Sequence, residues 1–480
     1  MPCGGPSLCK TDIETIRRWI RGGNPSSDGD PHIKTVDGVR YDFQAAGEFV
    51  LLRGENLEIQ ARHTAVETNA PLGPNAHTGL TSCVSLNTAF AMQVGKHRIT
   101  YEPNINGKPD PSGLQLRVDS NLVQLGTQGI SLVRDGRIMP TSAPGGVQIE
   151  ASGGTVIVIT PGWWEHYQVW YLNIDTRRVR ATEGLMGTIA PGNWLPALPD
   201  GSLLGPMPDD LDQRYRDLYD KFGNAWKVND STTLFDYAPG FSTKSFTIDN
   251  WPGRDSSGSC DLPKVFEGKR PLALMTRVAA EQLAAEIVDP DKKSNAIMDL
   301  VVTGEAAFAK TYLLADKIAR NNYPDPPDLG LPKDFDTLRV SDIRFEWNKT
   351  TDKDGDPLTY KLYVWPVNEM PDNNNAIPVS SENHWWRGSL KWALIVGLIG
   401  LLLFVFLSYT ALKKKRRLLV WLAIIILAAV ILAYFFGGRR TSFSRKIPDL
   451  KPGNAYFWKV ITEDGQGGTV ESETRRLNIR

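Results

Sequence analysis

The sequence predicts a mainly β protein, because short segments of alternating apolar and polar residues recur along most of its 480 residues. Glycine (43) and proline (32) are frequent between these segments, as expected for many tight turns, and 14 tryptophans suit the packed faces of sheets. Only four cysteines occur, so hydrophobic cores rather than disulfide bonds must stabilise the chain. The length is sufficient for about two to four domains.

Charge and motifs limit the classes of function. The 54 basic residues equal the 54 acidic residues, so no overall field favours nucleic acid, and we expect none as a partner. The sequence contains no H-E-x-x-H, G-x-S-x-G, P-loop or dinucleotide fingerprint. Its six histidines are scattered without a metal-ligand spacing. We therefore expect a protein that is not an enzyme and that carries no cofactor.

Residues 1–25 predict a short helical tail. Thr11 and Glu14 form a capping box, and Gly22-Gly23 ends the segment. The string MPCGGPSLCKTDIETIRRWIRGGNP resembles the last helix of a c-type cytochrome, whose Met-Pro carries the distal haem ligand. Because the sequence has no C-x-x-C-H, covalent haem is not expected within it. We interpret the tail as a cytochrome-like remnant or a docking helix.

Residues 28–252 predict the largest β domain. Asp37-Gly38 is a favoured two-residue hairpin turn between strands at 32–36 and 39–43. Turn residues separate the further strands throughout, which indicates an antiparallel domain. These strands are expected at 47–53, 57–63, 83–94, 97–101, 114–118, 147–151, 155–160 and 168–174.

Three strings in this domain resemble the von Willebrand factor type D family: GDPHIKTVDGVRYDFQAAGEFVLLR at its start, and ATEGLMGTIAPGNWLPALPDGS and YDKFGNAWKVNDSTTLFDY near its end. The resemblance implies an extracellular, β-rich and usually non-catalytic domain for adhesion, assembly or binding of large partners. Two positions depart from the family. Met186 stands where a cysteine is expected, and the loop 188–194 lacks the carboxylates of the family's calcium site. Disulfide-driven multimers and calcium in that loop are therefore not expected.

The Asp30-Pro31 bond is the first candidate site. It lies in a Gly-Asp-Pro-His sequence that some type D domains cleave by themselves. Asp–Pro bonds are acid-labile in general, because the aspartate carboxylate can attack its own carbonyl. The alternative is that Pro31 and His32 simply open a strand, and the sequence favours this alternative.

Three tryptophans, Trp163, Trp164 and Trp170, form the second candidate site. Such a cluster suits a stacking platform for sugar, as in a carbohydrate-active enzyme or a sugar-binding protein. Glu165 and Asp175 have no spacing that pairs them as glycosidase carboxylates. The sequence favours the alternative that the cluster is the core and rim of a sandwich.

Residues 253–332 predict a small helical appendage and a linker. Apolar residues at helical spacing favour helices at 270–287 and 292–321, separated by Pro290. The Pro-rich run 324–332 is typical of a stiff linker. The arrangement resembles the helical appendage that follows some bacterial type D domains.

Residues 333–480 predict one β-sandwich interrupted by an insertion. The strings FEWNKTTDKDGDPLTYKLYV and IPDLKPGNAYFWKVITEDGQGGTVES resemble the early and late strands of a fibronectin type III-like domain. Asp352, Asp354 and Asp356 have the spacing that starts a calcium loop, but Tyr363 stands where such a loop needs glutamate. A solvated turn is therefore favoured over a calcium site.

The insertion predicts a membrane hairpin. Residues 392–412 and 418–436 carry no charge, and each helix would span about 30 Å, the hydrocarbon thickness of a bilayer. The turn 413–417 between them is entirely basic, which favours the cytoplasmic side. We therefore expect a two-pass membrane protein with the lipid bilayer as a partner and most of the chain outside the cytoplasm.

These observations predict a membrane-anchored, extracytoplasmic adhesion, scaffold or binding protein without catalytic activity. Its expected partners are extracellular or periplasmic proteins or glycans. A carbohydrate-active enzyme or sugar-binding protein is the first alternative, and a subunit of a haem-containing assembly is the second.

Overall fold

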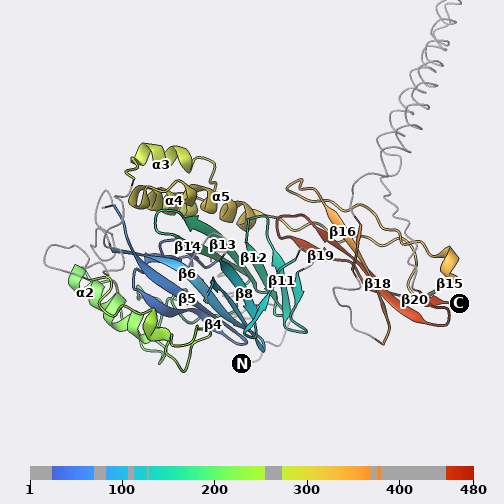
Figure 1. Cartoon of the computed structure of the whole chain (residues 1–480), viewed down its shortest axis with the longest axis horizontal. Helices are drawn as coiled ribbons and strands as arrows, with labels where there is room; N and C mark the ends of the chain where they lie inside the picture. The colour runs from blue at the N-terminus through green and yellow to red at the C-terminus, as the bar shows by residue number, and fades with distance from the viewer. Residues whose placement is uncertain are drawn as a thin grey trace, which may run out of the picture. The chain divides into compact units, whose positions relative to one another are not determined.

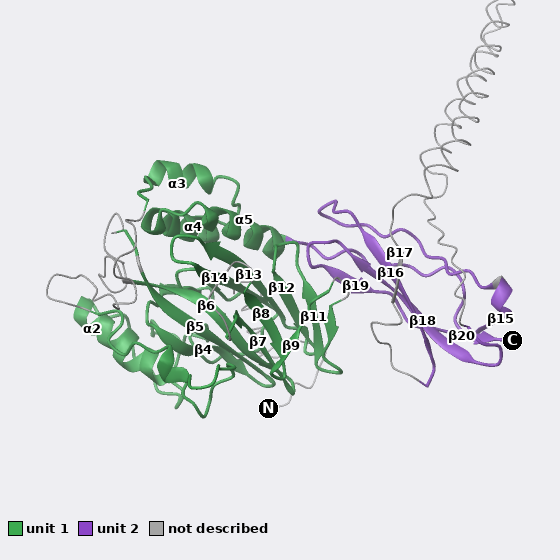
Figure 2. Cartoon of the chain, viewed as in Figure 1, with its two compact units in different colours: residues 1–320 green, residues 321–480 purple. Residues whose placement is uncertain are grey.

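The computed structural model contains two compact units, residues 1–320 and 321–480 (Figure 2). Both consist mainly of antiparallel strands with few helices, which confirms the predicted mainly β fold class (Figure 1). The structure describes residues 24–69, 83–105, 113–126, 129–253, 273–368, 376–379 and 450–480. The tail 1–23, on which the cytochrome-like interpretation rests, lies outside these residues.

The first sheet of unit 1 has eight strands in the order β10-β11-β12-β13-β14-β1-β2-β3. Strand β1 therefore lies between β14 and β2, and it pairs with both in antiparallel fashion. Asp37 and Gly38 lie in the connection between β2 and β3, and Gly38 has a φ of 78°. The pairing of Lys34 with Arg40 makes this connection one residue longer than the expected two-residue turn. The strands are β1 (Ser26–Asp28), β2 (His32–Lys34), β3 (Arg40–Asp42), β10 (Ile130–Ser131), β11 (Gly136–Pro140), β12 (Val147–Ala151), β13 (Val156–Trp164) and β14 (Val169–Arg177).

The second sheet of unit 1 has six strands that pair in sequence order. Both sheets contribute to one hydrophobic core, in which Phe49 and Ile59 of the second sheet join Ile157 and Ile174 of the first. Successive residues of a strand face opposite sides of its sheet, so Ile157 lies in this core while Val156 and Val158 are buried in a smaller cluster with Ile318 of the helical segment. The strands are β4 (Gly47–Gly54), β5 (Leu57–Glu67), β6 (Cys83–Val94), β7 (His97–Pro103), β8 (Leu114–Val118) and β9 (Asn121–Val123).

The segment after β14 packs on the same core. Helix α2 (Leu211–Tyr215) continues into the π-helical η1 (Arg216–Gly223), which buries Leu218 and Phe222. The short 3-10 helix η2 (Thr243–Ser245) follows. Met186, at the position where a cysteine was expected, is fully buried, so an apolar side chain fills the core there.

Three helices complete unit 1: α3 (Arg277–Leu283), α4 (Pro290–Thr303) and α5 (Ala307–Arg320). Asp289 caps α4, and Gly304 ends it in the left-handed region at a φ of 65°. The single helix expected at 292–321 is therefore two helices. Helix α5 lies over β13 and β14, where Phe308 stacks on Tyr171 with ring centroids 4.0 Å apart.

Unit 2 is one sheet in the order β15-β20-β18-β16-β17, with β19 paired to β18. Strand β16 pairs with β18 although a long segment separates them in sequence. Its core contains Trp347 and Trp458, and Phe345 contacts Trp458 edge to face at 5.0 Å. The elements are β15 (Asp336–Leu338), η4 (Val340–Asp342), β16 (Thr359–Pro366), β17 (Ala376–Val379), β18 (Ala455–Glu463), β19 (Thr469–Glu471) and β20 (Arg475–Ile479).

The expected two-pass membrane topology requires a correction. None of the helices in the described ranges combines the length and the apolar character that a membrane crossing needs. The longest among them, α4 and α5, have 14 residues each, or about 21 Å, which is shorter than a bilayer's hydrocarbon layer of about 30 Å. The segments 392–412, 413–417 and 418–436 lie outside the described residues. The structure does not support a two-pass membrane protein.

Candidate functional site

The candidate site is built on the connection between β1 and β2. Asp28 pairs with His32, so Gly29, Asp30 and Pro31 form a three-residue loop. A Cβ on Gly29 would lie only 2.9 Å from Oδ2 of Asp299, so the close approach of α4 requires glycine at this position. Asp30 and His32 are buried, with 2% and 5% of their surface exposed.

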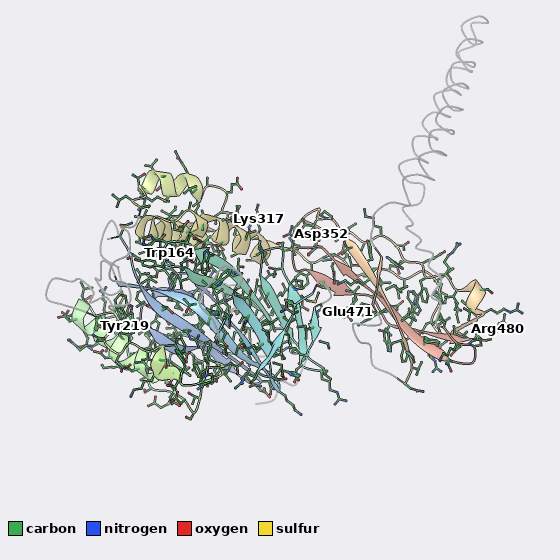
Figure 3. The ribbon with its side chains drawn as sticks, in the orientation of Figure 1. Trp164, Tyr219, Lys317, Asp352, Glu471 and Arg480 are labelled. Atoms are coloured by element: carbon green, nitrogen blue, oxygen red, sulfur yellow. The ribbon has the colours of Figure 1, made fainter. Side chains whose placement is uncertain are left out.

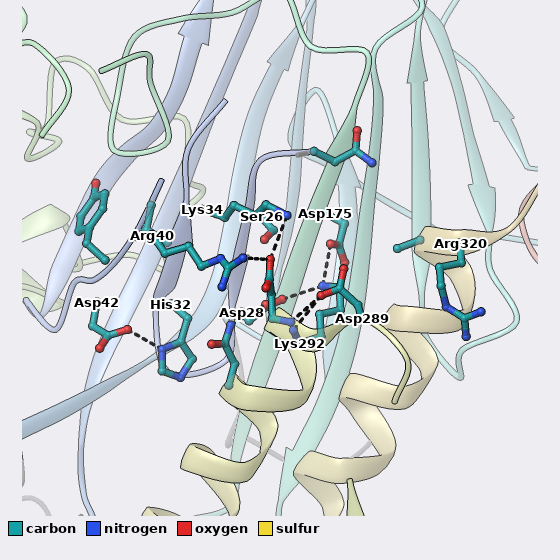
Figure 4. A pocket seen from close by; sticks show the side chains of 16 residues that line it. Ser26, Asp28, His32, Lys34, Arg40, Asp42, Asp175, Asp289, Lys292 and Arg320 are labelled. Carbon is teal, nitrogen blue, oxygen red and sulfur yellow. Dashed lines mark hydrogen bonds and ion pairs between the residues drawn. The ribbon is translucent and has the colours of Figure 1, made fainter. Parts of the chain in front are cut away.

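His32 lies at the centre of three carboxyl groups. Its Nδ1 is 2.6 Å from Oδ1 of Asp42 on β3, an interaction drawn in Figure 4. Its Nε2 is 3.1 Å from Oδ1 of Asp299 on α4 and 3.9 Å from Oδ2 of Asp30. The cross-strand register explains the first contact, because His32 and Asp42 are direct partners in the β2–β3 hairpin.

The loop and its carboxyl groups are held by further hydrogen bonds. The backbone N–H of His32 donates to the backbone carbonyl oxygen of Asp30. The side-chain amide of Gln44 donates to Oδ1 of Asp30, and the Tyr312 hydroxyl donates to Oδ2 of Asp299 at 2.8 Å. These partners fix the orientation of both carboxyl groups in the protein interior.

Burial and the mutual proximity of these groups shift their protonation. Burial raises the pKa of Asp30 to about 8, against the opposing effect of His32. Burial likewise raises the pKa of Asp299, again opposed by His32. Burial alone would lower the pKa of His32, but Asp30, Asp42 and Asp299 outweigh it and raise that pKa well above its usual value. The cluster is therefore a buried site in which an imidazole and carboxyl groups share protons.

A second buried cluster lies beside the first. Lys292 Nζ contacts Oδ1 of Asp28 at 3.0 Å and Oδ1 of Asp175 at 2.7 Å, as Figure 4 shows. The two carboxylates raise the pKa of Lys292, although burial acts in the opposite direction. Asn295 donates to the other oxygen of Asp28 at 3.2 Å. Helix α4 is thus joined to β1 and β14 by charge as well as by apolar packing.

A polar pocket of about 300 Å³ opens next to both clusters (Figure 4). His32 and Asp42 line it, so the buried cluster around His32 borders this pocket. Most of its other charged side chains are paired: Lys34 and Arg40 with Asp291, and Arg320 with Asp316.

The structure brings together residues that the sequence did not connect. Asp30 and Pro31 were predicted from their motif, whereas Asp42, Asp299 and Tyr312 were not. Asp42 was not predictable from the expected turn, because a two-residue turn at Asp37-Gly38 would pair His32 with Phe43, one residue away from the observed partner Asp42. Asp299 carries no local signal, since 267 residues separate it from His32.

The structure separates the three tryptophans of the predicted sugar platform. Trp164 is completely buried on the helix-covered side of the sheet and contacts Phe308 edge to face (Figure 3). Trp163 and Trp170 are cross-strand partners with ring centroids 5.2 Å apart, and both are partly exposed. Of the three tryptophans, only Trp163 and Trp170 are accessible to a ligand, so the three side chains do not form one continuous stacking surface.

Asp352, Asp354 and Asp356 lie close together in unit 2, with carboxylate oxygens within 4.8 Å of one another. Oδ1 of Asp352 accepts the backbone N–H groups of Asp354 at 2.8 Å and Asp356 at 3.3 Å. Asp354 accepts from the backbone and side chain of Asn322. These bonds form a self-contained polar turn, and they point to no ligand.

A comparison with known protein families finds no family model that matches this chain. The type D and fibronectin type III-like resemblances therefore stay expectations from sequence.

Proposed function

We propose that this chain is a β-rich binding or scaffold module that cleaves its own Asp30–Pro31 peptide bond and does not act as an enzyme on other molecules. One observation carries the proposal. The buried Asp30 carboxyl group lies beside His32, and the carbonyl group of the same Asp–Pro bond already accepts a hydrogen bond from the His32 backbone.

The chemistry needs only groups of the chain and one water molecule. An oxygen of the Asp30 side chain attacks the carbonyl carbon of Asp30, and the bond from that carbon to the Pro31 nitrogen breaks. A proton from the Asp30 carboxyl or the His32 imidazole passes to the nitrogen, which leaves as the new amino terminus. The acyl group becomes a five-membered cyclic anhydride, which water opens to a C-terminal Asp30.

The surrounding residues favour each part of this step. The His32 backbone N–H stabilises the negative charge that develops on the carbonyl oxygen, as donors of an oxyanion hole do. Asp42 holds the imidazole through Nδ1 and leaves Nε2 directed at Asp30 and Asp299. Gln44 fixes the attacking carboxyl group, so little conformational entropy is lost before attack.

The pocket beside the site supports self-processing over action on a separate substrate. Its cations contact neighbouring carboxylates: Lys292 contacts Asp28 and Asp175, and Lys34 contacts Asp291. A substrate would have to displace these ion pairs at a cost in desolvation and lost attraction. The Gly-Asp-Pro-His resemblance and the two β-rich units agree with a processed binding or scaffold protein.

The test is a time course of the purified chain at 25 °C, followed by intact mass and amino-terminal sequencing. The proposal predicts two fragments, 1–30 and 31–480, with the second beginning at Pro31. Asp30→Asn should give no fragment, because an amide is a poor nucleophile and carries no acidic proton. Asp356→Asn is the matched control and should cleave like the wild type. A wild-type chain that stays intact, or an Asp30→Asn variant that still cleaves at this bond, would contradict the proposal.

A further inference from the structure

We propose that Nε2 of His32 and the carboxylates of Asp30 and Asp299 form a binding site for a divalent transition-metal ion, with Zn²⁺ as the best fit, and that the bound ion blocks cleavage at Asp30–Pro31. The metal-binding part of this proposal is independent of the proposed function. The part in which the ion blocks cleavage rests on the proposed function.

The three ligand atoms have the separations that a small ion requires. All lie within 4.8 Å of one another. Nε2 of His32 is 3.1 Å from Oδ1 of Asp299 and 3.9 Å from Oδ2 of Asp30. A tetrahedral zinc ion with bonds of about 2.0–2.2 Å places its ligand atoms roughly 3.3–3.5 Å apart. The two separations from Nε2 lie on either side of this value, and the separation of the two carboxylate oxygens is at most 4.8 Å, so a modest contraction of the cluster accommodates the ion.

Each ligand is oriented by a residue behind it, as is usual around metal sites. Asp42 accepts the Nδ1–H of His32, so an ion can bind Nε2 in place of the proton that Nε2 shares with Asp299. Tyr312 donates to the far oxygen of Asp299, and Gln44 donates to the far oxygen of Asp30. The near oxygens of both carboxylates remain directed at Nε2.

The charge of the cluster also favours a cation. Three carboxyl groups surround one imidazole, and the residues that carry them come from β3, α4 and the β1–β2 loop. The buried cation Lys292, on the same helix as Asp299, contacts Asp28 and Asp175 instead. A divalent ion compensates negative charge in a buried site, where isolated carboxylates are costly.

The ligand set selects the type of ion. One imidazole nitrogen and two carboxylate oxygens suit zinc and its neighbours among the transition metals, whereas calcium and magnesium prefer six or more oxygen ligands. His32 and Asp42 line the adjacent pocket, which gives the ion a route and a water molecule for the fourth position.

A metal at this site is incompatible with self-cleavage. The Asp30 carboxylate that ligates the ion cannot attack its own carbonyl carbon, and a metallated Nε2 cannot supply the proton. The ion therefore keeps the Asp30–Pro31 bond intact, and its removal starts the reaction.

The binding test uses full-length Pro31→Ala, which keeps all three ligands but lacks the proline leaving group. Titration calorimetry with ZnCl₂ should show one equivalent bound, and Co²⁺ should give the visible absorption of a tetrahedral site. Asp299→Asn in this background should weaken binding by on the order of 100-fold, and Asp42→Asn by about 10–100-fold. Asp356→Asn in the same background should leave binding unchanged. Absence of binding, or equal binding by the Asp299→Asn variant with an unchanged circular dichroism spectrum, would overturn the site.

The regulatory half of the proposal, namely that the bound ion blocks cleavage at Asp30–Pro31, is tested on the wild-type chain. Cleavage should slow at least 10-fold with one equivalent of Zn²⁺ and recover when a chelator is added. Zinc that binds Pro31→Ala but leaves wild-type cleavage unchanged would overturn the regulatory half alone. A wild-type chain that never cleaves, even with chelator, would refute the proposed function and the regulatory half, while the Pro31→Ala titration still decides the metal site.

Discussion

The two units place the same dipeptide in opposite surroundings. Asp30-Pro31 of unit 1 lies in a loop whose aspartate is only 2% exposed and whose neighbours include His32. Asp356-Pro357 of unit 2 lies in a turn that is open to solvent. The residue types are identical, so any difference in reactivity must come from burial and from the groups nearby.

The neighbours of the second dipeptide show what the first one adds. Around Asp356 the nearby charges are Asp352 and Asp354, and burial together with these two carboxylates raises its pKa. Around Asp30 the fold supplies an imidazole, a donor to the backbone carbonyl and an amide that fixes the carboxyl group. The proposal therefore attributes the reactivity of an Asp–Pro bond to the groups that the fold places around it, and each of these groups can be tested separately.

The largest expected effect is on the rate of cleavage. His32→Gln removes the imidazole that supplies a proton, so cleavage at Asp30–Pro31 should slow by roughly 10²–10⁴-fold. The readout is the rate at which the fragment beginning at Pro31 accumulates. His97→Gln is a matched control, because His97 contacts Asp119 at 2.8 Å outside the site. Equal rates in the two variants would show that His32 plays no part.

The second effect concerns the stability of the clusters around β1. Lys292→Met leaves the buried carboxylates of Asp28 and Asp175 without their cation, which should lower the free energy of unfolding by about 3–5 kcal/mol. Arg277→Ala removes an exposed pair with Glu281 and should cost at most about 0.5 kcal/mol. Urea denaturation measures both. Similar losses of unfolding free energy in the two variants would contradict the claim that the buried ion pairs of Lys292 matter more to stability than the exposed pair of Arg277.

A smaller effect separates a charged from a neutral hydrogen bond. Tyr312→Phe removes the donor to Asp299 and should cost about 1.5–3 kcal/mol. Tyr171→Phe removes a bond to the Thr311 hydroxyl and should cost about 0.5–1.5 kcal/mol. If urea denaturation ranks the two variants in the opposite order, the carboxylate of Asp299 is not the group that Tyr312 stabilises.

The last effect develops only when the pH is lowered, and it concerns the buried histidine His63. His63 lies among Phe43 and Phe49, and burial lowers its pKa to about 3. The unfolded chain therefore takes up a proton below pH 6.5 that the folded chain does not. Stability from this group is full above pH 6.5 and falls by up to about 1.4 kcal/mol per pH unit down to pH 3. His63→Leu should remove that slope, as measured by thermal unfolding across this range, and an unchanged slope would contradict it.

Much of the fold was predictable because its signals are local. Strands expected at 83–94, 114–118 and 147–151 coincide with β6, β8 and β12, where alternation and turn residues define the limits. Strand β1 was missed, since its three residues are too few to show a period. The expected helix 292–321 continued through Gly304, because apolar spacing alone does not register a residue in the left-handed region.

The site was predictable only where the chain is contiguous. Asp30 and Pro31 stand together in one motif, whereas Asp299 and Tyr312 reach His32 and one another through tertiary packing of α4 and α5. Trp163 and Trp164 illustrate the same limit. They are the same residue type at adjacent positions, but strand alternation buries Trp164 and leaves Trp163 partly exposed. Sequence defines the reactive groups, and topology decides which of them meet.

The most direct measurement compares all the Asp–Pro bonds of this chain in one sample. The sequence contains five, beginning at residues 30, 110, 289, 325 and 356. Intact mass of the folded chain at neutral pH, with chelator present, should show cleavage only after Asp30, and unfolding in urea should abolish that selectivity. An intact chain, or fragments from several Asp–Pro bonds in the folded state, would contradict the claim that the buried cluster around His32 makes this bond reactive.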